Sequence, residues 1–210
     1  LFTLIDITDG MSFKRTDKYI DLVESTPIKD NIVQKAAMLL KENYGVSKGV
    51  TINLSKSIPD QKGLGGGSSN AASTLLCLNK LWDLDLTQLE LQSLALQLGS
   101  DVPFFIYGKT AWAEGRGELL SNFQYKERFF ILIFPDEKIN TKEAFNSFKI
   151  EDDVQLNKEN FHDDLSFNSF EKWARNKYSN INSLFKKFES VGKPRLSGTG
   201  STIFIEFDSE

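Results

Sequence analysis

The sequence predicts an α+β fold arranged in two lobes. Segments that alternate like strands and segments with the helical period both occur along its 210 residues. A glycine-rich stretch, GLGGGSS at residues 63–69, runs directly into a series of good helix formers. The succession of strand and helix patterns then restarts at Arg128. We therefore divide the chain into an N-terminal lobe over residues 1–125 and a C-terminal lobe over residues 126–210.

The composition is that of an ordinary globular protein, with 40% hydrophobic and 26% charged residues. A net charge of −4 gives no sign of a broad surface for nucleic acid, and no apolar run approaches the roughly 20 residues of a membrane span. The single cysteine, Cys77, rules out an internal disulfide and a cysteine metal cage. We expect a bacterial cytoplasmic protein, a monomer or weak homodimer, that binds neither nucleic acid nor membranes.

The first half of the N-terminal lobe is predicted from local signals. Short strands over 1–5 and 18–23 flank a turn at Asp9–Gly10. A helix over 31–44 follows, with Asp30 as its cap. The alternating segment GVTINLSKSIP, which begins at Gly49, is then expected to form a half-buried strand.

The second half of this lobe is predicted to be mainly helical. One helix spans about 68–81, and Thr87 with Glu90 forms a capping box for the next, which ends near Gly99. Pro103 indicates an extended segment. The segment TAWAEGRGELL reads as a hairpin with its turn at residues 115–117.

The C-terminal lobe begins with FFILIF, a buried strand that Pro135 ends. Thr141 is expected to cap a short helix through Phe148. The remaining predictions are a loop, two helices and a final strand, at 149–166, 168–176, 180–190 and 201–207.

The glycine-rich stretch has the features of an anion site. The first amides of a helix lack intrahelical acceptors, and the helix dipole adds partial positive charge there. Glycines let the backbone approach phosphate oxygens closely. The stretch is not a Walker A loop, because no lysine follows the glycines, and it departs from the dinucleotide pattern at Ser68. The alternative is a tight turn that packs a helix on a strand, which one or two glycines would satisfy.

Two further motifs carry chemistry. In LGSDVPFFIYG, residues 98–108, Asp101 is either a turn residue or a carboxylate in an apolar setting that orients or deprotonates a hydroxyl. In RLSGTGSTIF, residues 195–204, two glycines frame Thr199 before a strand. Alone this segment is a turn; together with the first loop it would form the opposite wall of a phosphate pocket.

The motifs PxxxGLGGGSSNAA, GSDVPFF and LSGTGS, in this order, resemble the GHMP small-molecule kinases. The segments IPDQKGLGGGSSNAAS, LGSDVPFFIYGKTAWAEGRGE and DNIVQKAAMLL resemble more closely the members that act on a cytidine-diphosphate-linked methylerythritol in the non-mevalonate isoprenoid pathway. The resemblance covers most of the chain and is weakest over 149–190. It implies an N-terminal lobe like ribosomal protein S5 and a ferredoxin-like C-terminal lobe.

The resemblance also implies the reaction, in which the γ-phosphate of ATP is transferred, with Mg²⁺, to the 2-hydroxyl of the substrate. Asp101 matches the catalytic aspartate, the base for that hydroxyl. Lys56 lies where the adenine end of ATP is expected; the alternative is a solvated strand lysine. The residues that match the ATP-phosphate loop are Pro59, Gly63, Leu64, Gly65, Gly66, Gly67, Ser68 and Ser69.

On the substrate side, Phe145 in NTKEAF matches an aromatic position that stacks on cytosine, and Thr141 in the same segment is taken as a second substrate contact. The alternative for Phe145 is a core residue on a helix face. No metal ligand is assigned, because the sequence does not choose among Ser68, Ser69 and Glu114.

Two departures from the family stand out. Its lysine-bearing first strand and Asp-Gly-Tyr-His stretch are absent, and the only histidine here is His162. The family also continues past the last strand, so we expect both ends to be missing. Two alternatives stay open: another GHMP kinase, acting on homoserine, mevalonate or a sugar, and a catalytically inactive nucleotide-binding module.

Overall fold

A computed structural model describes residues 1–24, 27–147, 158–159, 161 and 167–208. The chain forms two compact units. The first comprises Leu1–Ile58 and Gly65–Tyr125, and the second comprises Pro59–Leu64 and Lys126–Glu210. The short segment 59–64 thus groups with the second unit, although the residues before and after it belong to the first.

The first unit is built on a three-stranded mixed sheet with β3 in its centre. Strand β3 (Gly49–Ser55) pairs antiparallel with β1 (Gly10–Thr16) and parallel with β2 (Ile20–Glu24). The crossover between the parallel strands contains α1 (Ile32–Asn43). A parallel pair requires such a crossover, because a tight turn reverses the chain direction.

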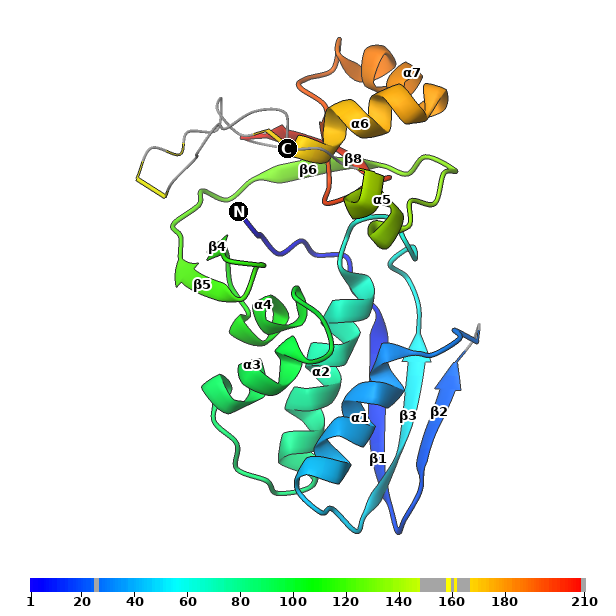
Figure 1. Cartoon of the computed structure of the whole chain (residues 1–210), viewed down its shortest axis with the longest axis vertical. Coiled ribbons are helices and arrows are strands. Elements are labelled where there is room, and N and C mark those ends of the chain that lie inside the picture. The colour runs from blue at the N-terminus through cyan, green and yellow to red at the C-terminus, as the bar shows by residue number, and fades with distance from the viewer. Residues whose placement is uncertain (25–26, 148–157, 160, 162–166, 209–210) are drawn as a thin grey trace. The chain divides into compact units, whose positions relative to one another are not determined.

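Helix α2 (Gly66–Leu81) packs beside α1 over this sheet (Figure 1). Two shorter helices follow, α3 (Gln88–Leu96) and α4 (Val102–Tyr107), and then the hairpin of β4 (Ala111–Glu114) and β5 (Leu119–Asn122).

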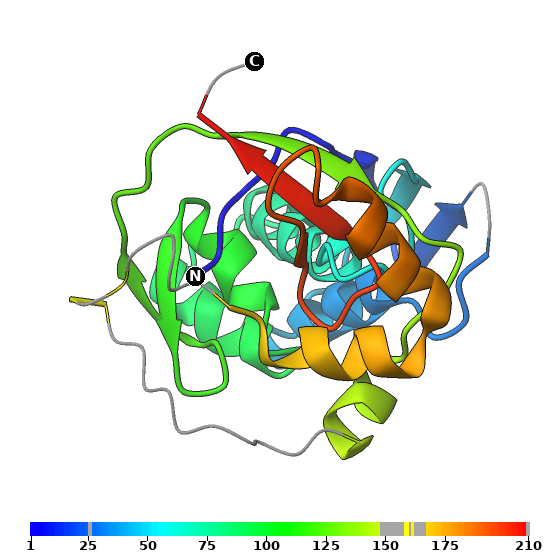
Figure 2. The ribbon, with the colours of Figure 1, turned by 90° about the horizontal axis from the view of Figure 1, so that it is seen from above.

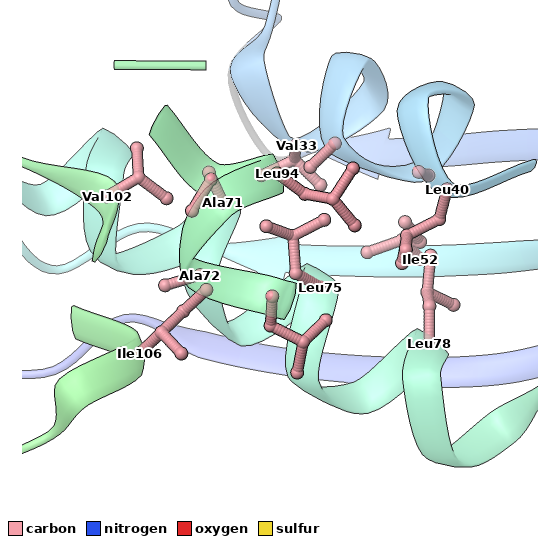
Figure 3. Packing of buried hydrophobic residues seen from close by; sticks show 14 of the residues in the cluster. Val33, Leu40, Ile52, Ala71, Ala72, Leu75, Leu78, Leu94, Val102 and Ile106 are labelled. Atoms are coloured by element: carbon pink, nitrogen blue, oxygen red, sulfur yellow. The ribbon is translucent and has the colours of Figure 1, made fainter. Parts of the chain in front are cut away.

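Apolar side chains from the three-stranded sheet and from helices α1 to α4 meet in one core (Figure 3). Leu75 and Leu78 of α2 and Ile52 of β3 have no exposed surface. Burying a side chain of this size contributes about 1.5–3 kcal/mol. The core thereby holds α2, and with it the glycine-rich stretch at its N-terminus, against the sheet.

The start of the chain differs from the prediction. Residues 1–5 do not form a strand; Phe2 makes an isolated bridge to Ala111 with hydrogen bonds of 2.9 and 3.0 Å. Gly10 begins β1 instead of completing a turn. Met11 and Phe13 explain the difference, because their alternating side chains pack against the core of the first unit.

Two helix boundaries are also corrected. Asn31 rather than Asp30 caps α1: its Oδ1 accepts from the amide of Val33 at 2.9 Å, whereas Asp30 has a φ of +55°. The segment at Pro103 is helical rather than extended. Proline lies in the first turn of α4, where its missing amide hydrogen removes no intrahelical bond.

Other predictions for this unit are confirmed. Thr87 and Glu90 form the capping box of α3, in which the Thr87 amide donates to Glu90 Oε2 at 2.8 Å. The hairpin lies where TAWAEGRGELL predicts it. Helix α2 begins two residues earlier than expected, so that Gly66 and Gly67 are themselves helical.

The second unit contains an antiparallel sheet of order β6-β8-β7, formed by Phe129–Ile133, Ile203–Phe207 and Arg195–Leu196. Figure 2 shows β8 alongside β6. The helices of this unit are α5 (Thr141–Ser147), α6 (Ser169–Lys177) and α7 (Ser179–Phe188). Their buried side chains form a second core with the sheet, made of Ile139, Ala144, Ala174, Ile181, Phe185, Leu196 and Ile203.

Thr141 is the first residue of α5 and not its cap. The amide of Glu143 donates instead to Asn140 Oδ1 at 3.2 Å. The loop predicted over 149–166 lies almost entirely outside the described residues, as does His162. Within the described ranges, none of the helices combines the length and the apolar character that crossing a membrane requires.

The cap of α1 gives a first prediction. Asn31→Ala removes the acceptor for the Val33 amide, and we expect a loss of about 1 kcal/mol in the free energy of unfolding. Asp30→Gly should leave stability within about 0.5 kcal/mol or raise it, because glycine tolerates the positive φ. Urea titration measures both variants. Equal losses in the two would contradict the assignment of Asn31.

Candidate functional site

The N-terminus of α2 presents backbone amides. Gly65, its N-cap, has a φ of +66° and makes no side-chain capping bond. A Cβ on Gly65 would stand 2.8 Å from the ring of Phe105, so that only glycine fits. The first intrahelical bond is donated by the amide of Ser69 to the Gly65 carbonyl at 2.8 Å. The amides of residues 66–68 therefore have no acceptor within the helix, which is the arrangement that binds anions.

Lys56 lies beside this helix start. It follows β3, and its side chain is only 14% exposed, so it is not a solvated strand lysine. Its Nζ is 3.4 Å from the point where a Cβ on Gly66 would stand. The ammonium also lies 2.5 Å from Oδ2 of Asp9. Lys56 thus brings an ammonium, paired with the Asp9 carboxylate, to the end of α2 that carries the positive pole of the dipole.

Asp9 is one of two residues around the glycine-rich stretch that sequence reasoning missed. The Asp-Gly dipeptide indicates a turn, but this carboxylate is buried and accepts hydrogen bonds from Lys56, Asn70 and two backbone amides. A carboxylate just before a strand carries no sequence signal of such a role.

The beginning of the glycine-rich stretch packs within the second unit against the SGTGS segment. The hydroxyl of Ser197 donates to the Gly63 carbonyl at 2.8 Å, and the amide of Thr202 donates to the Lys62 carbonyl at 3.1 Å. A Cβ on Gly63 would lie 2.2 Å from the Ser197 carbonyl oxygen, which requires glycine. The structure therefore brings together two motifs that lie more than 130 residues apart in the sequence.

Lys62 fastens the same segment through its side chain. Its Nζ donates to the carbonyl of Glu137 at 2.7 Å and also to that of Pro135. Burial lowers the pKa of Lys62, while the carboxylates of Glu137 and Asp136 act in the opposite direction. No sequence pattern indicated Lys62, because a single lysine in a loop is normally solvated.

Asp101 is the N-cap residue of α4, and its side chain makes no capping bond. Although the residue is accessible to solvent, desolvation by its surroundings raises the pKa of its carboxyl group. Phe105, whose ring contacts Gly65, lies four residues later. Residues four apart share a helix face, so Asp101 lies on the side of α4 that packs near the start of α2.

Phe145 and Thr141 both lie on α5 in the second unit. Phe145 is 62% exposed, so the interpretation as a core residue is wrong. Its ring meets Phe170 edge-on, with centroids 4.9 Å apart and an interplanar angle of 78°. Thr141 Oγ1 lies 3.3 Å from Thr199 Oγ1 of the SGTGS segment. Both predicted substrate residues are thus in one unit, and Thr141 contacts a glycine motif.

The described part of the chain holds no group of three or more His, Cys, Asp or Glu residues that could bind a metal ion. Glu114, one of the three candidates from the sequence, ends β4 and is exposed, while Ser68 and Ser69 lie in the first turn of α2. A protein-only metal cage is therefore absent from the described residues.

Comparison with known proteins places these motifs in a family. The model of the GHMP kinases N terminal domain matches residues 31–109, which include the glycine-rich stretch and Asp101. The crystal structure of a 4-(cytidine 5'-diphospho)-2C-methyl-D-erythritol kinase matches with a TM-score of 0.79 and 30% identity over 93% of this chain and 75% of that one. The mevalonate kinase of Methanococcus jannaschii, with a TM-score of 0.71 and 17% identity, shares the fold.

Two sequence relatives extend over all of this chain. The 4-diphosphocytidyl-2-C-methyl-D-erythritol kinase of Paraburkholderia xenovorans is 39% identical, and this chain covers 77% of its length. The kinase of the same name from Wigglesworthia glossinidia brevipalpis is 40% identical, with 72% of its length covered. The α+β fold is thus that of the GHMP kinases, and the chain belongs to the 4-diphosphocytidyl-2-C-methyl-D-erythritol kinase family.

Proposed function

We propose that the protein transfers the γ-phosphoryl group of ATP to the 2-hydroxyl of 4-diphosphocytidyl-2-C-methyl-D-erythritol. The observation that carries the proposal is the start of α2, where uncapped amides lie beside Lys56 and near the face of α4 that carries Asp101. The acceptor is inferred from the relatives, which are named as kinases of this compound. The test is turnover by the intact enzyme with ATP and this acceptor, compared with turnover of homoserine and of mevalonate. Phosphorylation of homoserine or mevalonate without phosphorylation of the proposed acceptor would refute the choice of acceptor.

The amides at the start of α2 are suited to hold the phosphates. Those of Gly66, Gly67 and Ser68 lack intrahelical acceptors, and the hydroxyls of Ser68 and Ser69 add further donors in the same turn. Phosphoryl transfer depends on positioning and charge neutralisation more than on covalent chemistry by the protein. A rigid row of donors at the positive end of a 16-residue helix supplies both.

Asp101 is proposed to orient the 2-hydroxyl and take its proton as the oxygen attacks the γ-phosphorus and the bond to the β-phosphate oxygen breaks. Desolvation raises the pKa of Asp101, which makes its carboxylate a stronger base than an ordinary aspartate. The absence of a side-chain capping bond leaves the carboxylate oxygens available to the acceptor.

Mg²⁺ is proposed as a second requirement, and when bound it neutralises charge on the phosphates. The donor set fits this use. Mg²⁺ is usually held by substrate phosphates with one or two protein ligands and several waters, which needs no protein cage. The hydroxyls of Ser68 and Ser69 and the carboxylate of Glu114 remain the candidates.

Phe145 and Thr141 are proposed to contact the cytidine end. The exposed ring of Phe145 offers a face for stacking on cytosine, and Thr141 offers a hydroxyl near Thr199. We further propose that the protein is located in the cytoplasm and exists as a monomer or weak homodimer. Its only cysteine, Cys77, is free, which supports a reducing compartment.

Asp101→Asn tests the base. It keeps the size of the side chain but cannot accept the proton, so we expect kcat to fall by roughly 10²–10⁴ with little change in ATP affinity. Because the pKa of Asp101 is raised, the acidic limb of kcat/KM in the unmodified enzyme should lie above the ordinary value of about 3.9. Asp85→Asn, at an exposed aspartate, is the control. Near-normal turnover of Asp101→Asn would assign Asp101 a structural role.

Gly67→Ala tests the phosphate loop without disturbing the fold. A Cβ on Gly67 would meet nothing closer than Ile32 Cγ2 at 3.7 Å, and alanine favours helix more than glycine does. We expect the free energy of unfolding to stay the same or rise by up to about 1 kcal/mol, while the methyl group weakens ADP binding. Thermal denaturation and calorimetry measure the two effects, and unchanged ADP affinity would count against phosphate contact at Gly67.

Phe145→Ala tests the cytidine contact. Base–aromatic stacking contributes about 1–3 kcal/mol, so KM for the cytidine substrate should rise while ATP affinity stays constant. Stability should fall by no more than about 1 kcal/mol, because the ring is largely exposed and its main contact is the edge-on pair with Phe170. Phe129→Ala, at another exposed phenylalanine of the second unit, is the control for general loss of apolar surface. An unchanged KM in Phe145→Ala would remove Phe145 from the substrate site.

A further inference from the structure

Asp9 is a buried carboxylate that the proposed reaction does not use. Its side chain is 1% exposed and accepts four hydrogen bonds. Oδ1 accepts from the amides of Ser57 at 2.7 Å and Ile58 at 2.8 Å. Oδ2 accepts from Lys56 Nζ at 2.5 Å and Asn70 Nδ2 at 2.8 Å. One residue thus ties together the segment before β1, the segment after β3 and the second turn of α2.

These contacts converge on the start of α2. Asn70 is four residues from Gly66, so it lies one turn from the uncapped amides. Lys56 Nζ and the side chain of Ile58 are 3.4 and 2.9 Å from the position of a Cβ on Gly66. Every donor to Asp9 therefore belongs to a residue at the helix start or to the short segment 56–58 that packs against it.

The carboxylate is charged at neutral pH. Burial by itself raises the pKa of Asp9, but the hydrogen bonds from Lys56, the two amides and Asn70 outweigh it, and the pKa lies below its usual value. Asp9 therefore holds Lys56 by an ion pair inside the protein, where solvent screening is weak. A lysine side chain has four rotatable bonds, and such a pair restricts it to one position before a ligand arrives.

We propose that Asp9 is a positioning residue for the nucleotide: it fixes the Lys56 ammonium and the first turn of α2 in the arrangement that receives the nucleotide. This inference rests on the proposed function of the α2 N-terminus. It differs from simple support of the fold. Loss of Asp9 should weaken nucleotide binding more than another substitution in the first unit that lowers the free energy of unfolding by the same amount.

Asp9→Asn is the informative substitution. The amide keeps the size of the side chain and one acceptor oxygen, which can serve the Ser57 and Ile58 amides. Its NH₂ group then faces Lys56 and Asn70, both of which are donors. The substitution thus removes the ion pair and the link to α2 while it preserves most of the packing.

Asn79→Ala provides a matched control. Asn79 is on the same helix near its other end, and it holds the following loop by two hydrogen bonds of 3.0 Å with Leu86. The substitution Asn79→Ala therefore also removes polar contacts of α2, but at the opposite end of the helix from Gly66. Asn70→Ala is a milder companion to Asp9→Asn, because it removes one of the four bonds and leaves the ion pair in place.

The experiment measures ADP affinity by calorimetry, KM for both substrates and thermal stability, in the intact enzyme and the three variants. We expect Asp9→Asn to bind ADP roughly 10-fold to 100-fold more weakly, with KM for the cytidine substrate unchanged. Asn70→Ala should shift ADP affinity in the same direction by a smaller factor, and Asn79→Ala should lower stability alone.

The outcomes separate this inference from the proposed function. If the unmodified enzyme binds no adenine nucleotide, the proposed function fails. If it binds ADP and Asp9→Asn keeps that affinity within about 2-fold, only the positioning role is refuted. Should Asp9→Asn fail to fold, Asn70→Ala decides: unchanged ADP affinity in that variant overturns the proposal, and a weakened affinity with Asn79→Ala unaffected supports it.

Discussion

The proposed nucleotide site rests on one requirement: the first turn of α2 must keep its amides free while its backbone stays fixed. A helix usually satisfies these amides with a side-chain cap, which also fixes the start. Here the N-cap is Gly65, which has no side chain and lies in a left-handed conformation. A β-carbon at this position would clash with the ring of Phe105. The amides stay available, and rigidity has to come from elsewhere in the fold.

Rigidity comes from buried polar contacts on each side of the Leu64–Gly65 bond. Within the first unit, Asp9 links the segment after β3 to Asn70 of α2. Within the second unit, Lys62 donates to two backbone carbonyls. Buried polar groups are costly unless satisfied, so each of these side chains holds its partners in one geometry. A flexible glycine sequence is in this way compatible with an ordered loop.

The proposed phosphate site lies at the positive end of a helix in a chain of net negative charge. The protein carries a net charge of −4, yet the positive end of α2 lies at this site, beside a Lys56 ammonium that is paired with the Asp9 carboxylate. Local fields at short distance outweigh a small net charge that is spread over the surface and screened by salt. A phosphate-binding site is therefore consistent with an acidic protein. The raised pKa of Asp101 in the same unit gives that carboxylate the basicity which a proton acceptor needs.

Local sequence signals predict most of the elements of this protein. They predict the capping box at Thr87, the hairpin near Gly115 and the helix after the glycines, because capping, turns and helical periodicity are effects of neighbouring residues. The three kinase motifs are identified through their resemblance to a family. Other features arise only in the folded chain. The roles of Asp9 and Lys62, the contact of Gly63 with Ser197 and the exposure of Phe145 all depend on residues distant in the chain. The same holds for β1, whose place in the sheet comes from packing of Met11 and Phe13 against the core, which overrides the turn preference of Asp9–Gly10.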